Sequence, residues 1–211
     1  FYIYSMKKLL SSYELKKDEI RKRLKEFREI LNKSEEEIFA ELVFCILTPQ
    51  SKARSCDKAV NDLFESKVIF SGNARAIESR LKSRVRFHKT KARHIIKARD
   101  LILNSSIKAK LVGNTLELRE WLVQNVYGLG YKEASHFLRN VGLGEELAIL
   151  DRHILKNLVE HGVIKEIPKS LTRKRYMEIE GKMKKFSENL GIPVSHLDLL
   201  FWSEETGEVF K

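Results

Sequence analysis

Hydrophobic positions recur at intervals of three and four residues along almost the whole chain, and this spacing predicts helices. Ser34 followed by Glu37 is a capping-box pair that starts one helix. Thr48-Pro49 ends it, because proline disfavours helical geometry in the residue before it. Other helices are predicted at the N-terminus and over about 51–64, 73–81, 90–103, 114–126, 132–141, 151–162, 171–189 and 195–204. The strand-like pieces are too short for a sheet, so the expected fold class is all-α.

Length and composition indicate a globular protein. A chain of 211 residues can bury a core as one domain or as two small lobes, and its 43% hydrophobic content excludes a disordered tail. No apolar run approaches the roughly 20 residues of a membrane span. No signal peptide is visible, because Lys7 and Lys8 lead into more charge, so we expect a cytoplasmic protein. The scarcity of Gln beside abundant Lys and Glu is typical of thermophile proteins.

The cysteine count limits the cofactors. Cys45 and Cys56 are the only cysteines, and they are too far apart for a CxxC motif. A four-cysteine zinc site and an iron–sulfur cluster are therefore excluded. We expect two reduced, partly buried thiols and no metal centre.

The charge indicates an anionic partner. The formal net charge is +11, which favours nucleic acid first and an anionic membrane second. No helix offers large exposed apolar residues opposite a lysine face, so the membrane is disfavoured. Nine Lys and Arg lie between Arg80 and Arg99 with no acid among them. Such a run is either a solvated face or a phosphate-contacting surface, and its lack of acidic partners favours the second.

A glycine hairpin lies between two of the predicted helices. Gly128-Leu129-Gly130 permits positive φ and close approach of another backbone. The first amides of the helix that follows can bind a phosphate. Taken alone, the two glycines could also form a plain turn between helices, and this alternative remains open.

Two charged residues near the hairpin could take part in a reaction. Lys132 lies at the start of a helix, where the helix dipole disfavours an ammonium and so favours the neutral, nucleophilic amine. An exposed lysine without a role is the alternative. Asp151 is predicted to cap the next helix, and a carboxylate held by helix amides is fixed in orientation. It could stabilise positive charge on a substrate or help move a proton.

These residues belong to a longer recognisable stretch. Residues 126–142, VYGLGYKEASHFLRNVG, followed by AILDRHI at 148–154, resemble the helix-hairpin-helix DNA glycosylase superfamily. Within it, nearly the whole chain is similar to the archaeal and thermophile branch of 8-oxoguanine DNA glycosylases that also act as AP lyases. The resemblance implies two helical lobes with an active-site cleft between them. One lobe, over 34–144, would end in the hairpin, and 1–33 plus 145–211 would form the other.

The resemblance also implies a mechanism. Lys132 matches the lysine that attacks the sugar C1′ and expels the damaged base, and Asp151 matches the aspartate that supports this attack. The resulting Schiff base permits β-elimination, which cleaves the strand. Gly128, Leu129 and Gly130 match the hairpin that holds DNA phosphates through backbone amides and can hold a monovalent cation on its carbonyls. The implied partner is double-stranded DNA containing 8-oxoguanine, bound by a monomer in the nucleoid of a prokaryote.

Four further residues are assigned by resemblance. Gln50, within Leu47–Ser51, would fill the gap left by the flipped nucleotide; an exposed Gln that begins a helix is the alternative. Phe87 and Trp202 would form two aromatic walls for the extruded base, because a flipped purine needs flat faces to replace lost stacking. Lys211 would help build this pocket, where its terminal carboxylate or a backbone carbonyl could accept from N7–H of the lesion. A core aromatic is the alternative for Trp202, and a frayed terminus for Lys211.

Two other functions remain open at this stage. A glycosylase for a different lesion would use the same hairpin, and Trp202 and Lys211 are the residues that would distinguish it. A non-catalytic helix-hairpin-helix module would bind DNA without covalent chemistry. An enzyme with an iron–sulfur cluster is excluded by the cysteine count, and the amine of Lys132 favours a bifunctional glycosylase and lyase.

Overall fold

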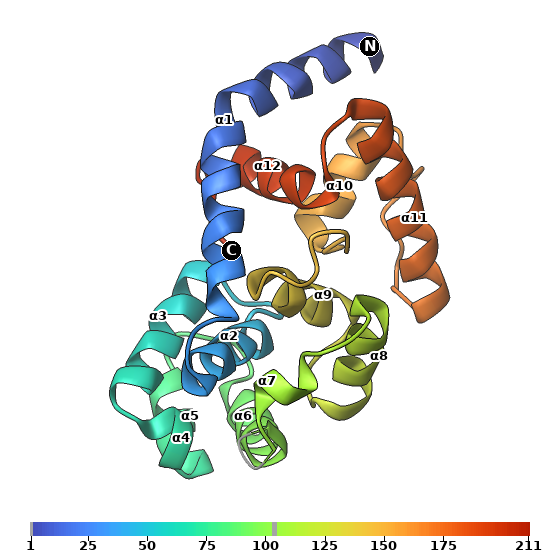
Figure 1. Cartoon of the computed structure of the whole chain (residues 1–211). Helices are drawn as coiled ribbons and strands as arrows, with labels where there is room; N and C mark the ends of the chain where they lie inside the picture. The colour runs from blue at the N-terminus through green and yellow to red at the C-terminus, as the bar shows by residue number, and fades with distance from the viewer. Residues whose placement is uncertain (1, 103–104) are drawn as a thin grey trace.

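The computed structural model describes residues 2–102 and 105–211, and this part of the chain is built of helices without a strand (Figure 1). The helices are α1 (Tyr2–Ile30), α2 (Glu35–Leu47), α3 (Ala53–Glu65), α4 (Val68–Ser71), α5 (Ala74–Leu81), α6 (His88–Ile102), α7 (Ile107–Lys110), α8 (Thr115–Asn125), α9 (Tyr131–Asn140), α10 (Arg152–Glu160), α11 (Arg173–Leu190) and α12 (Val194–Thr206). The expected all-α class is confirmed.

The predicted helix boundaries follow from capping. Ser34 Oγ accepts a hydrogen bond from Glu37 N at 3.2 Å, and Glu37 Oε2 accepts from Ser34 N at 3.1 Å, which is the expected capping box. The predicted end of the 90–103 helix, at Leu103, lies outside the described residues. The sequence did not predict α4 and α7, because four residues are too few to show a helical period.

Two clusters of buried hydrophobic residues hold the helices together. One draws its members from residues 38–147 plus Phe210, and the other from residues 9–27 and 148–209. The change from one cluster to the other falls between Leu147 and Ala148. The lobe boundaries at residues 34 and 144 stay a prediction. Figure 1 shows α1 running alongside both groups of helices, and α9, which packs against α1, α2 and α8, lies between them.

Two buried ion pairs join helices of the two clusters. Arg119 Nη1 in α8 lies 2.9 Å from Glu180 Oε2 in α11, and it also contacts Ser135 Oγ of α9 at 3.2 Å. Arg139 Nη1 in α9 lies 2.9 Å from Asp198 Oδ2 in α12. Removing one partner of such a pair typically costs about 3–5 kcal/mol, because the other charge stays buried. These pairs therefore fix α8 against α11 and α9 against α12.

No helix within the described ranges is long and apolar enough to cross a membrane.

Candidate active site

A cavity of about 810 Å³ opens where the two groups of helices meet. Four parts of the chain line it: the segment 48–54, residues along α9 from Lys132 to Arg139, the segment 149–153, and α12 with the residues that follow it. Its volume lies within the range of about 300–1,000 Å³ that is usual for ligand sites. Both Lys132 and Asp151 are among the lining residues, so the structure brings the two predicted catalytic side chains to one site.

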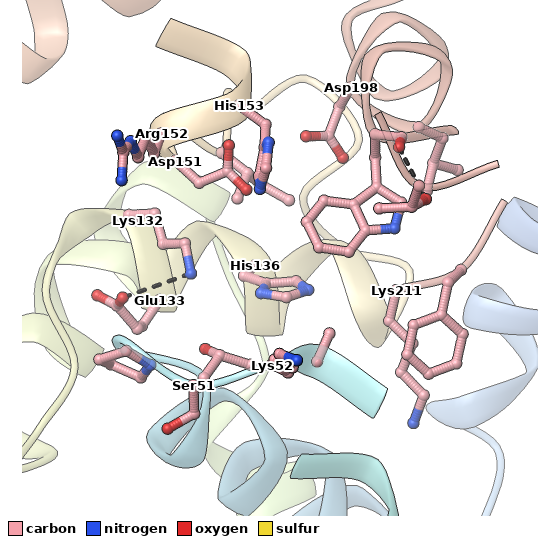
Figure 2. A pocket seen from close by; sticks show the side chains of 18 of the residues that line it. Ser51, Lys52, Lys132, Glu133, His136, Asp151, Arg152, His153, Asp198 and Lys211 are labelled. Carbon is pink, nitrogen blue, oxygen red and sulfur yellow. Dashed lines mark hydrogen bonds and ion pairs between the residues drawn. The ribbon is translucent and has the colours of Figure 1, made fainter. Parts of the chain in front are cut away.

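Lys132 is the second residue of α9, directly after the hairpin. Its Nζ lies 3.5 Å from Glu133 Oε1, and its side chain is 21% exposed. Figure 2 shows this pair at one wall of the cavity. The other carboxylate oxygen of Glu133 accepts from Gly130 N at 3.2 Å. Glu133 therefore connects the hairpin to the amine, and its position three residues after Gly130 is the capping signal that could have revealed it.

Asp151 caps α10, as predicted. Its Oδ1 accepts from Ile154 N at 2.8 Å, and the residue lies on a different element from Lys132 (Figure 2). The backbone before it is held by Tyr176, whose hydroxyl donates to Ala148 O at 2.6 Å and accepts from Leu150 N at 3.3 Å. The carboxylate is therefore oriented both by its own helix and by α11.

The hairpin needs its first glycine for two independent reasons. Gly128 has φ +89°, and a Cβ atom there would lie 2.4 Å from Nδ1 of His94. Burial, aided by Lys97, lowers the pKa of His94, so the ring beside the hairpin is neutral at physiological pH. Leu129 is buried in the first hydrophobic cluster and anchors the turn. Two hairpin amides are engaged within the protein, because Leu129 N donates to Val126 O at 3.2 Å and Gly130 N donates to Glu133.

Gln50 and Phe87 occupy exposed turns. Gln50 has φ +54° and lines the cavity at the end of α2. Phe87 has φ +56°, is 53% exposed and is not among the lining residues, so its role as an aromatic wall stays a prediction. Its left-handed turn before α6 sets the ring beside the Arg86 guanidinium, 5.4 Å from the ring centre. Phe210 lines the cavity instead.

Trp202 lines the cavity from α12. Its ring lies edge-on to His153, with 5.4 Å between the centroids and 88° between the planes. The indole Nε1 is buried without a hydrogen-bond partner among the described residues. Trp202 is thus available as a flat wall, and the structure also gives it a place at the edge of the first hydrophobic cluster.

Lys211 also lines the cavity, and it is anchored there. Its Nζ lies 2.8 Å from Glu41 Oε1 and 3.1 Å from Asp57 Oδ1, and 4.8 Å above the Phe44 ring. Burial alone would lower the pKa of Lys211, but Glu41 and Asp57 raise it above its ordinary value. The ammonium therefore fixes the last residue in place, in contrast to a frayed terminus.

Sequence reasoning missed His136, which follows Lys132 by one turn on the same face of α9 and lines the cavity. Its ring packs edge-on against Phe44 at 5.7 Å. Burial lowers the pKa of His136 well below its ordinary value, and the positive charges of Arg139, Lys132 and Lys211 lower it further. The four-residue spacing from Lys132 is the signal that could have found this neutral imidazole.

The basic run between Arg80 and Arg99 is only partly a surface. Lys91 is buried, which corrects the expectation of a continuous phosphate-contacting face. Arg80 and Arg84 both pair with Asp62, at 3.0 and 3.6 Å. Six cations of the run remain exposed: Lys82, Arg84, Arg86, Lys89, Arg93 and Lys97.

Comparison with known proteins identifies the family. The family model described as 8-oxoguanine DNA glycosylase matches residues 20–192. An 8-oxoguanine DNA glycosylase/AP lyase from Fusobacterium nucleatum is 46% identical over 205 residues, which cover 94% of each chain. The crystal structure of the Thermotoga maritima 8-oxoguanine DNA glycosylase superposes with a TM-score of 0.91 at 34% identity and covers 100% of both chains.

A further solved structure is the Methanocaldococcus jannaschii 8-oxoguanine glycosylase/lyase in complex with a 15mer DNA that contains 8-oxoguanine. It has a TM-score of 0.86 at 38% identity and covers 96% of this chain and 99% of that one. The similarity thus extends over the fold and over the parts that form the cavity. The chain belongs to the 8-oxoguanine DNA glycosylase family.

Proposed function

We propose that this chain excises 8-oxoguanine from double-stranded DNA and then cleaves the strand at the abasic site that remains. One observation carries the proposal: the amine of Lys132 opens onto a cavity that Asp151 also lines, directly after a glycine hairpin. Family membership supports the substrate, because the relatives it resembles are 8-oxoguanine DNA glycosylase/AP lyases.

In this proposal Lys132 is the nucleophile. Its amine attacks C1′ of the damaged nucleotide, and the N-glycosidic bond breaks with its electron pair leaving on the base. The attached amine then passes a proton to O4′, and the C1′–O4′ bond breaks, so the sugar ring opens to a protonated Schiff base. This cation acidifies C2′–H, so loss of that proton expels the 3′ phosphate and cleaves the strand. Glu133, the carboxylate 3.5 Å from Nζ, holds the amine at the cavity wall.

Asp151 in this proposal stabilises the positive charge that develops on the sugar. Its carboxylate is pre-oriented by Ile154 N, so no reorganisation is needed as charge forms. Asp151→Asn is a clean test, because asparagine caps a helix as well as aspartate does. The variant removes the charge and leaves α10 capped.

The test is cleavage of an end-labelled duplex with 8-oxoguanine opposite cytosine. We expect wild-type protein to release a β-elimination product, and Lys132→Gln to release none. Asp151→Asn should slow cleavage far more than it weakens binding. Lys165→Gln, an exposed lysine away from the cavity, is the matched control and should cleave like wild type. Full activity in Asp151→Asn would reject its role.

We propose that Trp202, Phe210 and Lys211 form the pocket for the extruded base. Their presence among the lining residues supports this, since Trp202 and Phe210 bring aromatic rings and Lys211 is held in place by Glu41. A panel of lesion duplexes tests the substrate. Cleavage of 8-oxoguanine above all other lesions is expected, and preferential cleavage of another lesion would assign the chain a different substrate.

We also propose that the protein acts as a monomer in the prokaryotic cytoplasm, bound to the nucleoid. One chain supplies both Lys132 and Asp151 to the cavity, so no second copy is needed. The chemistry uses an amine and needs no cofactor. A monovalent cation on the carbonyls of the 128–130 hairpin is compatible with the structure, because the neutral ring of His94 brings no positive charge beside Gly128.

A further inference from the structure

A buried lysine lies beneath the segment that carries Gln50. Lys91 in α6 is 4% exposed, and its ammonium donates to three acceptors of one segment. The acceptors are Leu47 O at 2.7 Å, Pro49 O at 2.8 Å and Ser51 Oγ at 2.9 Å. An ammonium has three donors, so all of them are spent on residues 47–51.

This segment needs an external partner. The last carbonyls of α2 have no acceptor role inside the helix and carry the negative end of its dipole. Gln50 is held at φ +54°, a left-handed conformation that is strained for a non-glycine residue. The Lys91 ammonium donates to one of these carbonyls, Leu47 O, and to Pro49 O beyond the helix end, and so closes the turn around Gln50.

The hydrogen bonds around Lys91 also extend to the neighbouring turn before α6. Ser51 Oγ, which accepts from Lys91, also accepts from Arg86 N at 3.0 Å. Lys91 N in turn donates to Phe87 O at 2.9 Å at the start of α6. The backbone on both sides of Gln50 is thereby tied to α6, at the edge of the cavity that Lys132 opens onto.

Burying the Lys91 ammonium costs free energy, and this cost favours a specific role for the residue. Burial lowers the pKa of Lys91 to about 8, although Cys56 and Glu133 act in the opposite direction. An apolar side chain would fill this space without that cost. A buried charge whose donors all contact the one segment 47–51 is suited to holding that segment in one conformation.

We propose that Lys91 is a positioning residue for base extrusion: it holds Gln50 at the rim of the cavity, where Gln50 fills the gap that the extruded nucleotide leaves. This inference rests on the proposed function. It assigns to Lys91 a step before the chemistry of Lys132, so its loss should matter most when a base pair must be broken.

The experiment compares single-turnover excision from two duplexes. In one, 8-oxoguanine is paired with cytosine; in the other it faces a tetrahydrofuran spacer, so that little pairing has to be lost. Lys91→Met removes all three donors at similar length. We expect it to slow excision from the paired duplex roughly tenfold more than from the spacer duplex. Lys58→Met, an exposed lysine of the adjoining α3, should leave the ratio of the two rates unchanged.

Two further variants keep the inference testable. Ser51→Ala removes one acceptor of the Lys91 ammonium and leaves the number of buried charges unchanged. It should shift the ratio of the two excision rates in the same direction by a smaller factor. In a Gln50→Ala background, Lys91→Met should add nothing to the ratio, because the side chain that it positions is absent. If Lys91→Met does not fold, Ser51→Ala carries the test.

The outcomes are distinct. Equal slowing on both duplexes in Lys91→Met, or an unchanged ratio in Ser51→Ala, would overturn the positioning role while leaving the proposed function standing. Failure of the wild-type protein to excise from either duplex would instead overturn the proposed function.

Discussion

A buried hydroxyl group forms two hydrogen bonds to the backbone that leads into Asp151, and its removal should displace the aspartate. Tyr176 is 1% exposed in α11, and its hydroxyl bonds to Ala148 O at 2.6 Å and to Leu150 N at 3.3 Å. Tyr176→Phe deletes one oxygen atom and keeps the ring. It leaves two buried backbone groups of the segment 148–150 without a partner.

The cost can be worked from these two bonds. A buried polar group left unpaired costs about 1–3 kcal/mol. The bond to Leu150 N is long and contributes less than the bond to Ala148 O, so we expect a loss of about 2–3 kcal/mol in the free energy of unfolding. The segment should also shift, and a displacement of about 1 Å at a catalytic group can cost roughly 100-fold in rate. We therefore expect excision to slow roughly 10- to 100-fold.

Urea denaturation and single-turnover excision of 8-oxoguanine measure the two effects. Tyr13→Phe is the matched control, because Tyr13 lies in the same hydrophobic cluster and its hydroxyl bonds only to a side chain, His196 Nδ1, at 2.8 Å. It should lose about 1 kcal/mol and keep its rate. A Tyr176→Phe protein with wild-type stability and rate would refute the reasoning, as would equal rate losses in both variants.

Three other changes have expected outcomes. Gly128→Ala would place Cβ against His94, so it should weaken duplex binding in a filter or anisotropy assay, whereas Gly181→Ala, which meets no neighbour, should not. His136→Phe should make stability less sensitive to acid: the native imidazole stays neutral while the unfolded one protonates below about pH 6.5, so wild type loses up to about 1.4 kcal/mol per pH unit there from this group. Urea melts at pH 7.5 and 5.5 measure this, and equal losses in both proteins would contradict it. Lys211→Met leaves Glu41 and Asp57 without their cation and should cost about 1–3 kcal/mol at pH 7; unchanged stability would show that the tail is not anchored by this contact.

Local signals explain why the helices could be predicted. Ser34, Asn114 and Asp151 each precede a hydrophobic stripe, and each side chain accepts from an amide of the helix that it starts. Short spacings likewise place Lys132 and Asp151 at the starts of helices, whereas their catalytic roles come from the resemblance to the glycosylase superfamily.

Other features depend on which elements meet. Phe87 lies in a left-handed turn outside the cavity lining, and the sequence does not reveal that turn. The anchoring of Lys211 requires Glu41 and Asp57, which come from two distant helices. Lys91 did carry a signal: it precedes the inward Ile95 by four residues, so it lies on the apolar face of α6, yet the basic run around it favours an exposed position.

The central claim is that Lys132 forms a covalent bond to the sugar of the damaged nucleotide, and reductive trapping tests it most directly. Borohydride added during the reaction with an 8-oxoguanine duplex reduces a Schiff base to a stable protein–DNA adduct. We predict an adduct with wild-type protein and none with Lys132→Gln, although the variant still binds the duplex. An undiminished adduct in Lys132→Gln would contradict the account.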